Sequence, residues 1–241
     1  MLRHRFRLNQ AIAKSGICSR RQADLLIAAG RVCLNGVVVV DFNATVDPGK
    51  DSVMVDGRRV EIKSFTYIAL HKPKGVVTTT ADEKGRRTVI DLLPRHLTHL
   101  RPVGRLDMYS EGLLLLTNDG RLTQRVTHPS HHLPKHYKVE VRGFVKPKDL
   151  RTLASGMVLD DGPTARAQVH PLRSGVASSS FEIVLTEGRS RQIRRMCALL
   201  GYRVIRLVRV AIGGLQLGQM QPGSWRPLTA AEVKEFVAGD Y

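Results

Sequence analysis

Cysteine is scarce in this sequence of 241 residues, and the three cysteines, Cys18, Cys33 and Cys197, form no C-x-x-C pair and no metal-ligand spacing. An odd number of isolated cysteines indicates a reducing compartment. Long apolar runs are also missing, since none approaches the roughly 18 residues that a membrane helix needs. The N-terminal segment MLRHRFRLNQ lacks the apolar core of a signal peptide. We therefore expect a soluble, cytoplasmic protein that does not associate with membranes.

Acidic residues are few relative to basic ones. Lys plus Arg number 38 and Asp plus Glu number 21, which gives a formal net charge of +17. The excess is spread along the chain and is not confined to a tail. Such a balance favours a polyanionic partner, with nucleic acid as the leading candidate. A merely basic soluble protein is the alternative that charge alone leaves open.

The motifs of many cofactor-dependent and metal-dependent enzymes are absent. There is no Walker-A loop, no G-x-G-x-x-G, no H-E-x-x-H and no G-x-S-x-G elbow. No Cys/His/Glu set fits a zinc deaminase. His128, His131, His132 and His136 are close in sequence but have no acidic or cysteine partner at a ligand spacing. A solvated or RNA-facing loop is the favoured interpretation there, and we expect neither a metal site nor a cofactor.

The length allows one large domain or two smaller ones, and the first sixty residues predict a small α-β unit. Its first helix is expected over Leu8–Ser15, with Gly16 as its end. Ser19 and Gln22 form a capping box for a second helix that ends at Gly30. Two hairpins follow, at the turns Asn35-Gly36 and Asp56-Gly57. We expect this unit to cover residues 1–62 and a second domain to cover residues 63–241.

Arg20, Arg21 and Arg31 lie at the start of the second predicted helix and just after its end. Arginines beside a helix N-terminus suit the phosphate backbone, although a solvated cap fits these residues equally well. The stretch RLNQAIAKSGICSRRQADLLIAAGRVCLNG resembles the S-four domain, an RNA-binding module shared by a ribosomal small-subunit protein and tyrosyl-tRNA synthetases. The resemblance covers about Arg7–Val60 and implies binding of structured RNA.

Beyond residue 65 strands dominate, and the pattern predicts an α+β domain with a mixed or antiparallel sheet. In the helix around RQIRRMCALL, the residues Ile193, Met196, Cys197 and Leu200 share one face, so Cys197 is expected to be a buried structural thiol. Before this helix we expect a strand-turn-strand over TYIALHKPKGVVTTT, a short helix capped by Thr88, a helix over RLTQRVTHP and a strand over KHYKVEVRG. A helix opened by Pro147, a hairpin that turns at Asp161-Gly162 and a strand over FEIVL are expected next. After it we expect a strand over YRVIRLVRVAIG and a final helix with a Thr229/Glu232 capping box.

The stretch RPVGRLDMYSEGLLLLTNDG, residues 101–120, contains the most informative carboxylate. Leu113 to Leu116 predict a strand that is buried on both faces, and Asn118-Asp119-Gly120 predicts the turn that follows it. Asp107 is then expected in a loop that leads into a core strand. Taken alone, an Asp in this position is most often a turn or capping residue. A lone carboxylate can also act without a cofactor, as a nucleophile or base toward a nucleoside.

Four motifs, HKPKGVV, GRLDMYSEGLLLLTNDG, KHYKVEV and EGRSRQIRRMCALLGYRV, occur in this order along the chain. Together they resemble the bacterial rRNA pseudouridine synthases, in the branch that contains the small-subunit synthase RsuA and the large-subunit synthases RluB, RluE and RluF. The resemblance covers nearly the whole chain. It implies isomerisation of one uridine in ribosomal RNA by base flipping, without a cofactor. The implied partner is rRNA or a ribosomal assembly intermediate, and we expect a monomer.

Within that branch the motifs point in two directions. RQIRRMC and the G-x-W-R-x-L-T segment favour the RluF type, whereas HPS and the LDDGP hairpin favour RluB. Ser190 stands where relatives often carry Asn, which blurs the assignment. We favour large-subunit rRNA as the substrate.

The resemblance also implies roles for single residues. Asp107 is the catalytic aspartate, which attacks either the ribose anomeric carbon or the uracil ring. Arg105 enters the space that the flipped uridine vacates, and Tyr137 stacks on the target base and helps to remove its carbon-5 proton. Arg194 pairs with the aspartate, and Leu207 packs on the base. By residue type alone, Tyr137 and Leu207 would be ordinary core residues.

Further residues complete the predicted site. Lys72 and Pro73 match the family's K-P-x-G turn, where we expect a structural role. The predicted RNA-binding residues are Arg20, Arg21, Arg31, Arg189 and Arg191.

Two functions from other classes are alternatives to a synthase. A non-catalytic rRNA-binding assembly factor on the same scaffold would be expected to lose Asp107, Tyr137 or Arg194, and a methyltransferase would need a glycine-rich nucleotide loop, which the sequence lacks.

Overall fold

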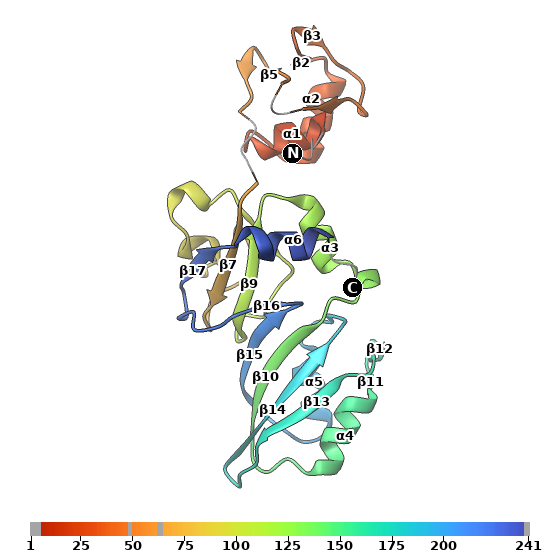
Figure 1. Cartoon of the computed structure of the whole chain (residues 1–241), viewed down its shortest axis with the longest axis vertical. Coiled ribbons are helices and arrows are strands. Elements are labelled where there is room, and N and C mark those ends of the chain that lie inside the picture. Colours follow the sequence, from red (N-terminus) through yellow and green to blue (C-terminus); the bar gives the residue numbers. More distant parts are fainter. Residues whose placement is uncertain (1–5, 48–49, 62–64, 239–241) are drawn as a thin grey trace. The chain divides into compact units, whose positions relative to one another are not determined.

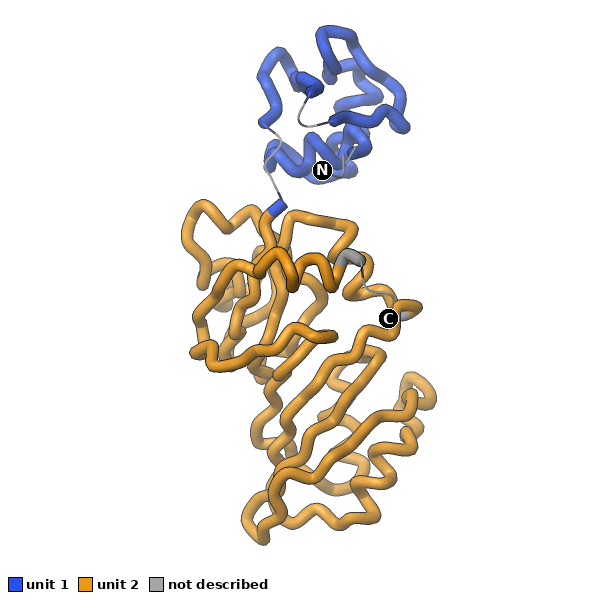
Figure 2. The backbone as a smooth tube through the Cα atoms, viewed as in Figure 1, with its two compact units in different colours: residues 1–65 blue, residues 66–241 orange. Residues whose placement is uncertain are grey.

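The chain folds into two compact units in the computed structural model, which describes residues 6–47, 50–61 and 65–238. Unit 1 is Met1–Phe65 and unit 2 is Thr66–Tyr241 (Figures 1 and 2). The boundary expected between residues 62 and 63 lies outside the described residues. Each unit has its own hydrophobic core, so each is described separately.

Unit 1 begins with helices α1 (Leu8–Lys14) and α2 (Arg20–Ala28). The predicted capping box is confirmed, because the Gln22 amide N–H donates to Ser19 Oγ at 3.3 Å and the Ser19 N–H donates to Gln22 Oε1 at 2.9 Å. Gly16 follows α1 with a φ of 85°, a conformation that costs glycine least. The local sequence therefore determines where both helices begin or end.

The strands of unit 1 are short. Strands β2 (Val32–Leu34), β3 (Val37–Val38), β5 (Val53–Val55) and β6 (Arg58–Arg59) form a sheet in the order β3-β2-β5-β6, and β1 (Phe6–Arg7) pairs with β4 (Thr45–Val46). Asn35 and Gly36 both have positive φ, at 53° and 85°, which is the geometry of a two-residue hairpin turn. Both predicted hairpins are confirmed.

Unit 2 is built on a nine-stranded sheet with the order β13-β14-β10-β15-β9-β7-β17, to which β8 is added beside β9 and β16 beside β15. All of its described pairings are antiparallel except that of β9 with β15, so the sheet is mixed, as predicted. Its strands are β7 (Tyr67–Lys72), β8 (Arg101–Val103), β9 (Glu111–Thr117), β10 (Lys135–Arg142), β13 (Gln168–Arg173), β14 (Ser178–Leu185), β15 (Val204–Ile212), β16 (Leu215–Gln216) and β17 (Trp225–Pro227). A separate hairpin joins β11 (Val158–Leu159) to β12 (Gly162–Pro163).

Helices cover different parts of this sheet (Figure 1). They are α3 (Gly120–Thr127), α4 (Pro147–Ser155), α5 (Gln192–Leu199) and α6 (Ala230–Ala238), with 3-10 segments at Ile90–Leu92, Arg95–Leu97 and Pro129–His131. Residues of α3 and α6 share a core with Leu113 and Leu115, whereas Leu114 and Leu116 belong to the core on the other face of β9. The four leucines are therefore buried on both faces, as predicted.

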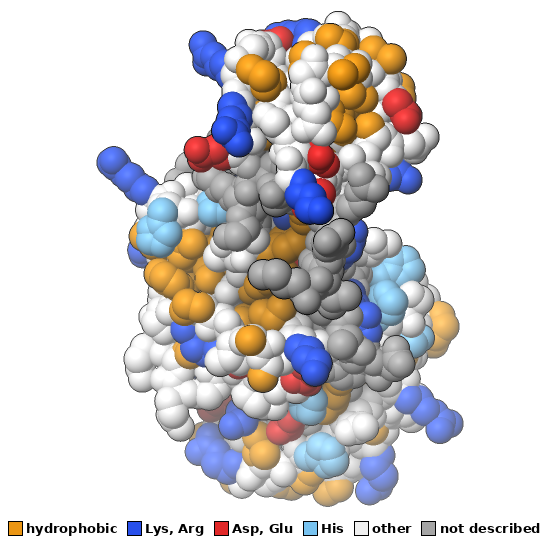
Figure 3. Space-filling model, turned by 45° about the horizontal axis from the view of Figure 1, so that its top comes forward, with side chains coloured by type: hydrophobic (Ala, Val, Ile, Leu, Met, Phe, Trp, Pro, Cys, Tyr) orange, Lys and Arg blue, Asp and Glu red, His pale blue; other side chains and the backbone are white. Residues whose placement is uncertain are grey.

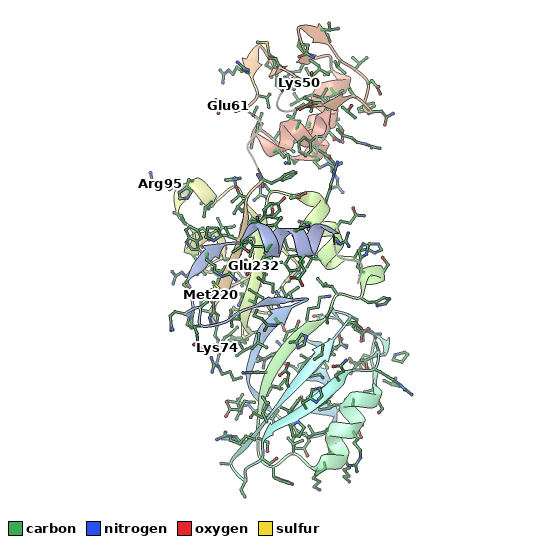
Figure 4. All side chains as sticks on the ribbon, viewed as in Figure 1. Lys50, Glu61, Lys74, Arg95, Met220 and Glu232 are labelled. Atoms are coloured by element: carbon green, nitrogen blue, oxygen red, sulfur yellow. The ribbon has the colours of Figure 1, made fainter. Side chains whose placement is uncertain are left out.

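Helix α5 packs on β10, β14 and β15 in a further core. Ile193, Met196 and Cys197 are buried there, and Leu200 packs against them. Burial raises the pKa of the Cys197 thiol to about 12, which keeps it protonated and unreactive. The capping box of the last helix is also present, since the Thr229 N–H donates to Glu232 Oε2 at 2.8 Å and the Glu232 N–H to Thr229 Oγ1 at 3.2 Å. Glu232 is labelled on α6 in Figure 4.

Three local predictions were wrong. Residues 76–80 do not form a strand after β7, because Val77 makes only one bridge, to Thr88, and Thr78 is bonded to a distant loop. The short helix expected after Thr88 forms as the 3-10 segment Ile90–Leu92, but its N-cap is Val89, and the Thr88 N–H and hydroxyl instead donate to the carboxylate of Asp91. The β11–β12 hairpin turns at residues 160–161, since Leu159 already pairs with Gly162.

Candidate active site

Asp107 lies in the loop of residues 104–110 between β8 and β9, hereafter the Asp107 loop. Thr78 holds the loop from one side, because its Oγ1 donates to the Leu106 carbonyl at 2.7 Å and accepts from the Leu106 N–H at 3.2 Å. The Gly75 N–H donates to the Met108 carbonyl at 2.8 Å. Within the loop, the Ser110 N–H donates to the Asp107 carbonyl at 3.0 Å. The backbone around the carboxylate is thus fixed by groups from the turn after β7.

Lys72 reinforces this arrangement from inside the unit. Its side chain is fully buried, and Nζ donates to the carbonyl oxygens of Ser110 at 2.8 Å and Pro73 at 3.1 Å, with Met108 at 3.5 Å. Burial lowers the pKa of Lys72 to about 8, although Asp107 and Glu111 act in the opposite direction. The ammonium group therefore ties the K-P-K-G turn to the last residues of the Asp107 loop, Met108 and Ser110.

Arg194 holds the Asp107 loop from the α5 side. Its Nη2 donates to the Tyr109 carbonyl at 2.8 Å, and Nη1 donates to the Val204 carbonyl at 3.4 Å. The predicted direct pair with Asp107 is not formed, since no ion pair joins the two among the described residues. Burial and Arg191 lower the pKa of Arg194, and Asp107 opposes that shift, so the carboxylate is near enough to act electrostatically. Arg194 contacts the backbone two residues after the aspartate.

A cavity of about 640 Å³ opens beside Asp107, hereafter the Asp107 cavity, and is lined by Arg105, Asp107, Tyr137 and Leu207. These residues come from the Asp107 loop, β10 and β15. Its volume is in the usual range for a small-molecule or nucleobase pocket. The structure therefore brings together four of the five residues that were predicted to act on the substrate, while Arg194 lies behind the loop.

Two adjacent strands form the apolar wall of the cavity. Val139 on β10 is opposite Leu207 on β15, and Tyr137 is opposite Arg209, with a register shift between His136 and Tyr137. Leu207 is buried, and Tyr137 is half-buried and packs against the α5 core. Arg105 is exposed at the entrance of the Asp107 loop. The wall thus offers a ring and an aliphatic side chain to a flat ligand, with a cation nearby.

Further polar residues line the same cavity and were not singled out from the sequence, among them Lys135, Arg209 and Ser110. Lys135 precedes Tyr137 by two positions and Arg209 follows Leu207 by two, so the period of two along a strand could have found both. Burial lowers the pKa of Lys135, and Arg209 adds to that shift. Ser110 is buried, and its Oγ has no hydrogen-bond partner in the described part of the chain.

Gly112 permits the close approach of β9 to β15. It pairs with Arg209 in the parallel contact and has a φ of 112°. A Cβ at this position would lie 2.2 Å from the Arg209 carbonyl oxygen, a distance that side chains cannot adopt. Glycine is therefore required for the contact that places the end of the Asp107 loop against β15.

Arg189 and Arg191 line the cavity but differ in their contacts. Arg189 donates to the carbonyls of Asp161 at 3.2 Å, Gly162 at 3.0 Å and Pro163, so it anchors the β11–β12 hairpin. Arg191 is exposed, with a φ of 50°, and its side chain has no hydrogen bond within the described residues, although its carbonyl accepts from the Arg195 N–H at 2.9 Å. Of these two predicted RNA-binding residues, only Arg191 presents its guanidinium group without an internal partner.

The basic residues predicted in unit 1 are at its surface. Arg20 and Arg21 are exposed in the first turn of α2. Arg31 forms a two-pronged pair with Asp56, with distances of 2.7 and 2.6 Å from Nε and Nη2 to the carboxylate oxygens. Figure 3 shows Lys and Arg side chains distributed over the visible face of both units. Exposed charge of this kind suits the phosphates of a nucleic acid.

The described residues contain neither a cluster of metal ligands nor a membrane-spanning helix. They include no group of three or more His, Cys, Asp and Glu side chains that could hold a metal ion. His136 pairs with Glu182 at 2.9 Å, and the rings of His128 and His131 lie 5.9 Å apart. Within the same residues, no helix combines the length and the apolar character that crossing a membrane requires.

Comparison with known proteins agrees with this geometry. Residues 66–199 match the family model described as RNA pseudouridylate synthase, and residues 6–52 match the S4 domain. An uncharacterised RNA pseudouridine synthase of Mycobacterium tuberculosis is 42% identical, over 95% of this chain and 92% of its own length. The ribosomal large subunit pseudouridine synthase B of Bacillus subtilis is 38% identical, over 96% of both chains.

A solved structure shows the same fold over nearly the full length. The crystal structure of a pseudouridylate synthase superimposes with a TM-score of 0.69 and 30% identity, covering 96% of this chain and 99% of that one. The chain therefore belongs to the RNA pseudouridine synthase family, with an S4 domain before the synthase domain.

Proposed function

We propose that this enzyme converts one uridine of large-subunit ribosomal RNA to pseudouridine, with Asp107 as its nucleophile. The observation that carries the proposal is the placement of Asp107 at a cavity of nucleobase size, on a loop held by Thr78, Lys72 and Arg194. A loop whose backbone is fixed in this way orients its side chain before the substrate arrives. The choice of large-subunit rRNA is supported by the named function of the Bacillus subtilis relative.

The bound uridine must leave its helix, because a base inside structured RNA cannot rotate about its glycosidic axis. Flipping costs a few kcal/mol. The exposed, permanently charged guanidinium of Arg105 can fill the vacated space and contact phosphates. Stacking on Tyr137 contributes about 1–3 kcal/mol, and Leu207 supplies an apolar contact for the base. These contacts together offset the cost of flipping.

The reaction exchanges one glycosidic bond for another. The bond between C1′ and N1 breaks, the uracil turns within the cavity, and C5 forms the new bond to C1′. The hydrogen on C5 then leaves as a proton, and Tyr137 is proposed to assist its removal. Asp107 forms a transient covalent bond either to C1′ or to the ring, and its carboxylate is regenerated at the end.

Unit 1 is proposed to bind structured RNA through α2 and the following hairpin, with Arg20, Arg21 and Arg31 facing phosphates. Arg191 is proposed to contact the backbone near the flipped uridine, and Arg189 to act beside it while anchoring the β11–β12 hairpin.

We further propose that the protein acts as a monomer in the cytoplasm. Light scattering tests the oligomeric state, and cell fractionation tests the localisation. Most of the affinity should come from phosphates and should not depend on Asp107.

The decisive experiment is tritium release from rRNA labelled at uridine C5, with the wild type and Asp107→Ala compared. Formation of the new carbon–carbon bond must expel that hydrogen, so we expect release by the wild type alone and equal rRNA binding by both. Release by both proteins would show that another residue is the nucleophile. Binding without release by either would instead favour a non-catalytic assembly factor.

A further inference from the structure

Arg209 is a buried cation that lines the Asp107 cavity and forms no ion pair with a carboxylate of the described residues. Its side chain is only 5% exposed. Nε donates to the Leu113 carbonyl at 2.8 Å, which fixes the orientation of the guanidinium plane. Nη2 is inaccessible to water and has no hydrogen-bond partner among the residues that the structure describes. Buried arginines are normally paired, so an unpaired one in a functional cavity requires an explanation.

The cations around Arg209 increase the free-energy cost of burying its guanidinium group without a carboxylate partner. Burial lowers the pKa of both Lys72 and Lys135, and the charge of Arg209 lowers each of them further. Arg209 is therefore close enough to repel both lysines. No ion pair of the described residues includes any of the three cations. Lys135 and Arg209 line the cavity together with the carboxylates of Asp107 and Glu187, and the two cations can interact with an anion that forms there.

The position of Arg209 indicates that it interacts with the base of the bound uridine and not with the ribose. Tyr137 is its direct partner across β10 and β15, and Leu207 is two residues away on the same face of β15. Directly opposite residues of neighbouring strands have Cβ atoms about 4.5–5.5 Å apart. The Cβ of Arg209 thus lies beside Tyr137, its Nε reaches the Leu113 carbonyl on β9, and the residue lines the same cavity as the two side chains that are proposed to contact the uracil.

The reaction itself creates an anion at this place. When C1′–N1 breaks, the bonding electron pair remains on the uracil and spreads from N1 onto O2 and O4. If Asp107 adds to the ring first, negative charge likewise moves onto the carbonyl oxygens. Either route leaves the base more negative than in the RNA, until C5 bonds to C1′ and the C5 proton leaves.

We propose that Arg209 is a catalytic residue that donates hydrogen bonds to the uracil and stabilises the negative charge that develops on it during glycosidic cleavage. The inference rests on the proposed function of the same cavity. Arg209 keeps its proton throughout, and its contribution is electrostatic. A preorganised donor in a water-excluded site strengthens its interaction as charge develops, which lowers the barrier more than it tightens substrate binding.

The test uses the full-length enzyme and an rRNA fragment that carries either uridine or 5-fluorouridine at the modified position. Fluorine withdraws electrons, so the detached base is less basic and needs less help from the protein. Arg209→Gln removes the charge but keeps an N–H donor for the Leu113 carbonyl, and Arg209→Lys keeps the charge. Arg206→Gln is the matched control, because Arg206 is on the same strand, is exposed, and pairs with Glu111. Single-turnover loss of the target nucleoside is measured for each.

We expect Arg209→Gln to slow conversion of uridine by about 10²–10³-fold, the usual effect of removing one such donor. Arg209→Lys should lose less. The deficit of both variants should shrink clearly with 5-fluorouridine, while RNA affinity and the thermal midpoint stay near those of the wild type. Arg206→Gln should show the same rate as the wild type with either base.

A deficit of equal size for the two bases would overturn the proposal. If it came with weaker RNA binding and a salt dependence reduced by about one phosphate contact, Arg209 would be a backbone contact. If it came with a lower thermal midpoint, its role would be structural. Unchanged rates in an active Arg209→Gln enzyme would sink this inference alone, whereas a wild type that makes no pseudouridine would sink the proposed function as well.

Discussion

The cations of this enzyme occupy two contrasting settings. Arg20 and Arg21 in unit 1 are exposed to solvent, whereas Lys72 and Arg209 in unit 2 are buried beside the Asp107 loop. An exposed guanidinium keeps its freedom and acts on any nearby phosphate through a screened field. A buried one is held by specific carbonyls, as Lys72 is by Ser110 and Pro73. The same charge therefore supplies affinity in one setting and geometry in the other.

The largest effect is expected from removal of the buried ammonium group. Lys72→Met leaves the Ser110 and Pro73 carbonyls without their donor, which should lower the free energy of unfolding by about 3 kcal/mol. Because the Ser110 carbonyl belongs to the Asp107 loop, activity should fall further than the unfolded fraction explains. Urea titration and tritium release measure the two losses. Lys74→Met, two residues along in the same turn and exposed (Figure 4), should stay within about 0.5 kcal/mol of the wild type.

The burial of Lys72 also predicts that the folding stability depends on pH. The pKa of Lys72 is lowered to about 8 in the folded protein, below the usual value of 10.5. Between these values the unfolded chain binds more protons than the folded one, so folding stability should rise with pH across this window. Lys72→Met should lack this component. Chemical unfolding of both proteins at pH 7.5 to 10.5 isolates it as a difference, and parallel curves would contradict the assignment.

A smaller loss, confined to catalysis, is expected for the arginine behind the loop. Arg194→Met removes the donor to the Tyr109 carbonyl, so the Asp107 loop loses its attachment to α5. We expect single-turnover activity to fall by about 10²-fold, because a misplacement near 1 Å has that effect. RNA affinity should change little. Arg195→Met serves as the control, since Arg195 is on the same helix but pairs with Asp161; an equal loss there would point to α5 as a whole.

The smallest effect is expected at the surface of unit 1. The double variant Arg20→Ala and Arg21→Ala should weaken rRNA binding by about tenfold at low salt and reduce the salt dependence by about two contacts. The rate of the bound complex should be unchanged. Filter binding at several salt concentrations, with single-turnover rates at saturating enzyme, separates the two quantities. A fall in the saturated rate would mean that these arginines also orient the substrate.

Local chemistry determined the features that were predicted correctly. The Ser19 and Gln22 box, the Asn35-Gly36 turn and the leucines of β9 depend on residues within a few positions of one another. The role of Asp107 as the nucleophile stays a prediction, made from its motif and not from its local pattern, which also fits a turn.

Distant contacts decided the features that were missed. Residues 76–80 have strand-forming side chains, but Thr78 is bonded to Leu106 across 28 residues, which competes with any local pairing. Likewise Arg194 donates to the Tyr109 carbonyl, which is 85 residues away in the sequence. The motif had suggested the carboxylate of Asp107 as its partner. Arg209 shares a strand face with Leu207, yet its burial and its missing partner follow only from the folded neighbourhood.

The parallel contact at Gly112 has a consequence for the order of folding. It joins β9 to β15, and Arg209 reaches the Leu113 carbonyl across 96 residues. Contacts of such separation form late, because closing a long loop costs entropy before any pairing compensates for it. The Asp107 loop and the Leu207 wall therefore meet only when the two halves of the sheet dock. During synthesis the chain cannot form its cavity until β15 has left the ribosome, so we expect a growing or truncated chain to be inactive even where unit 1 already binds RNA.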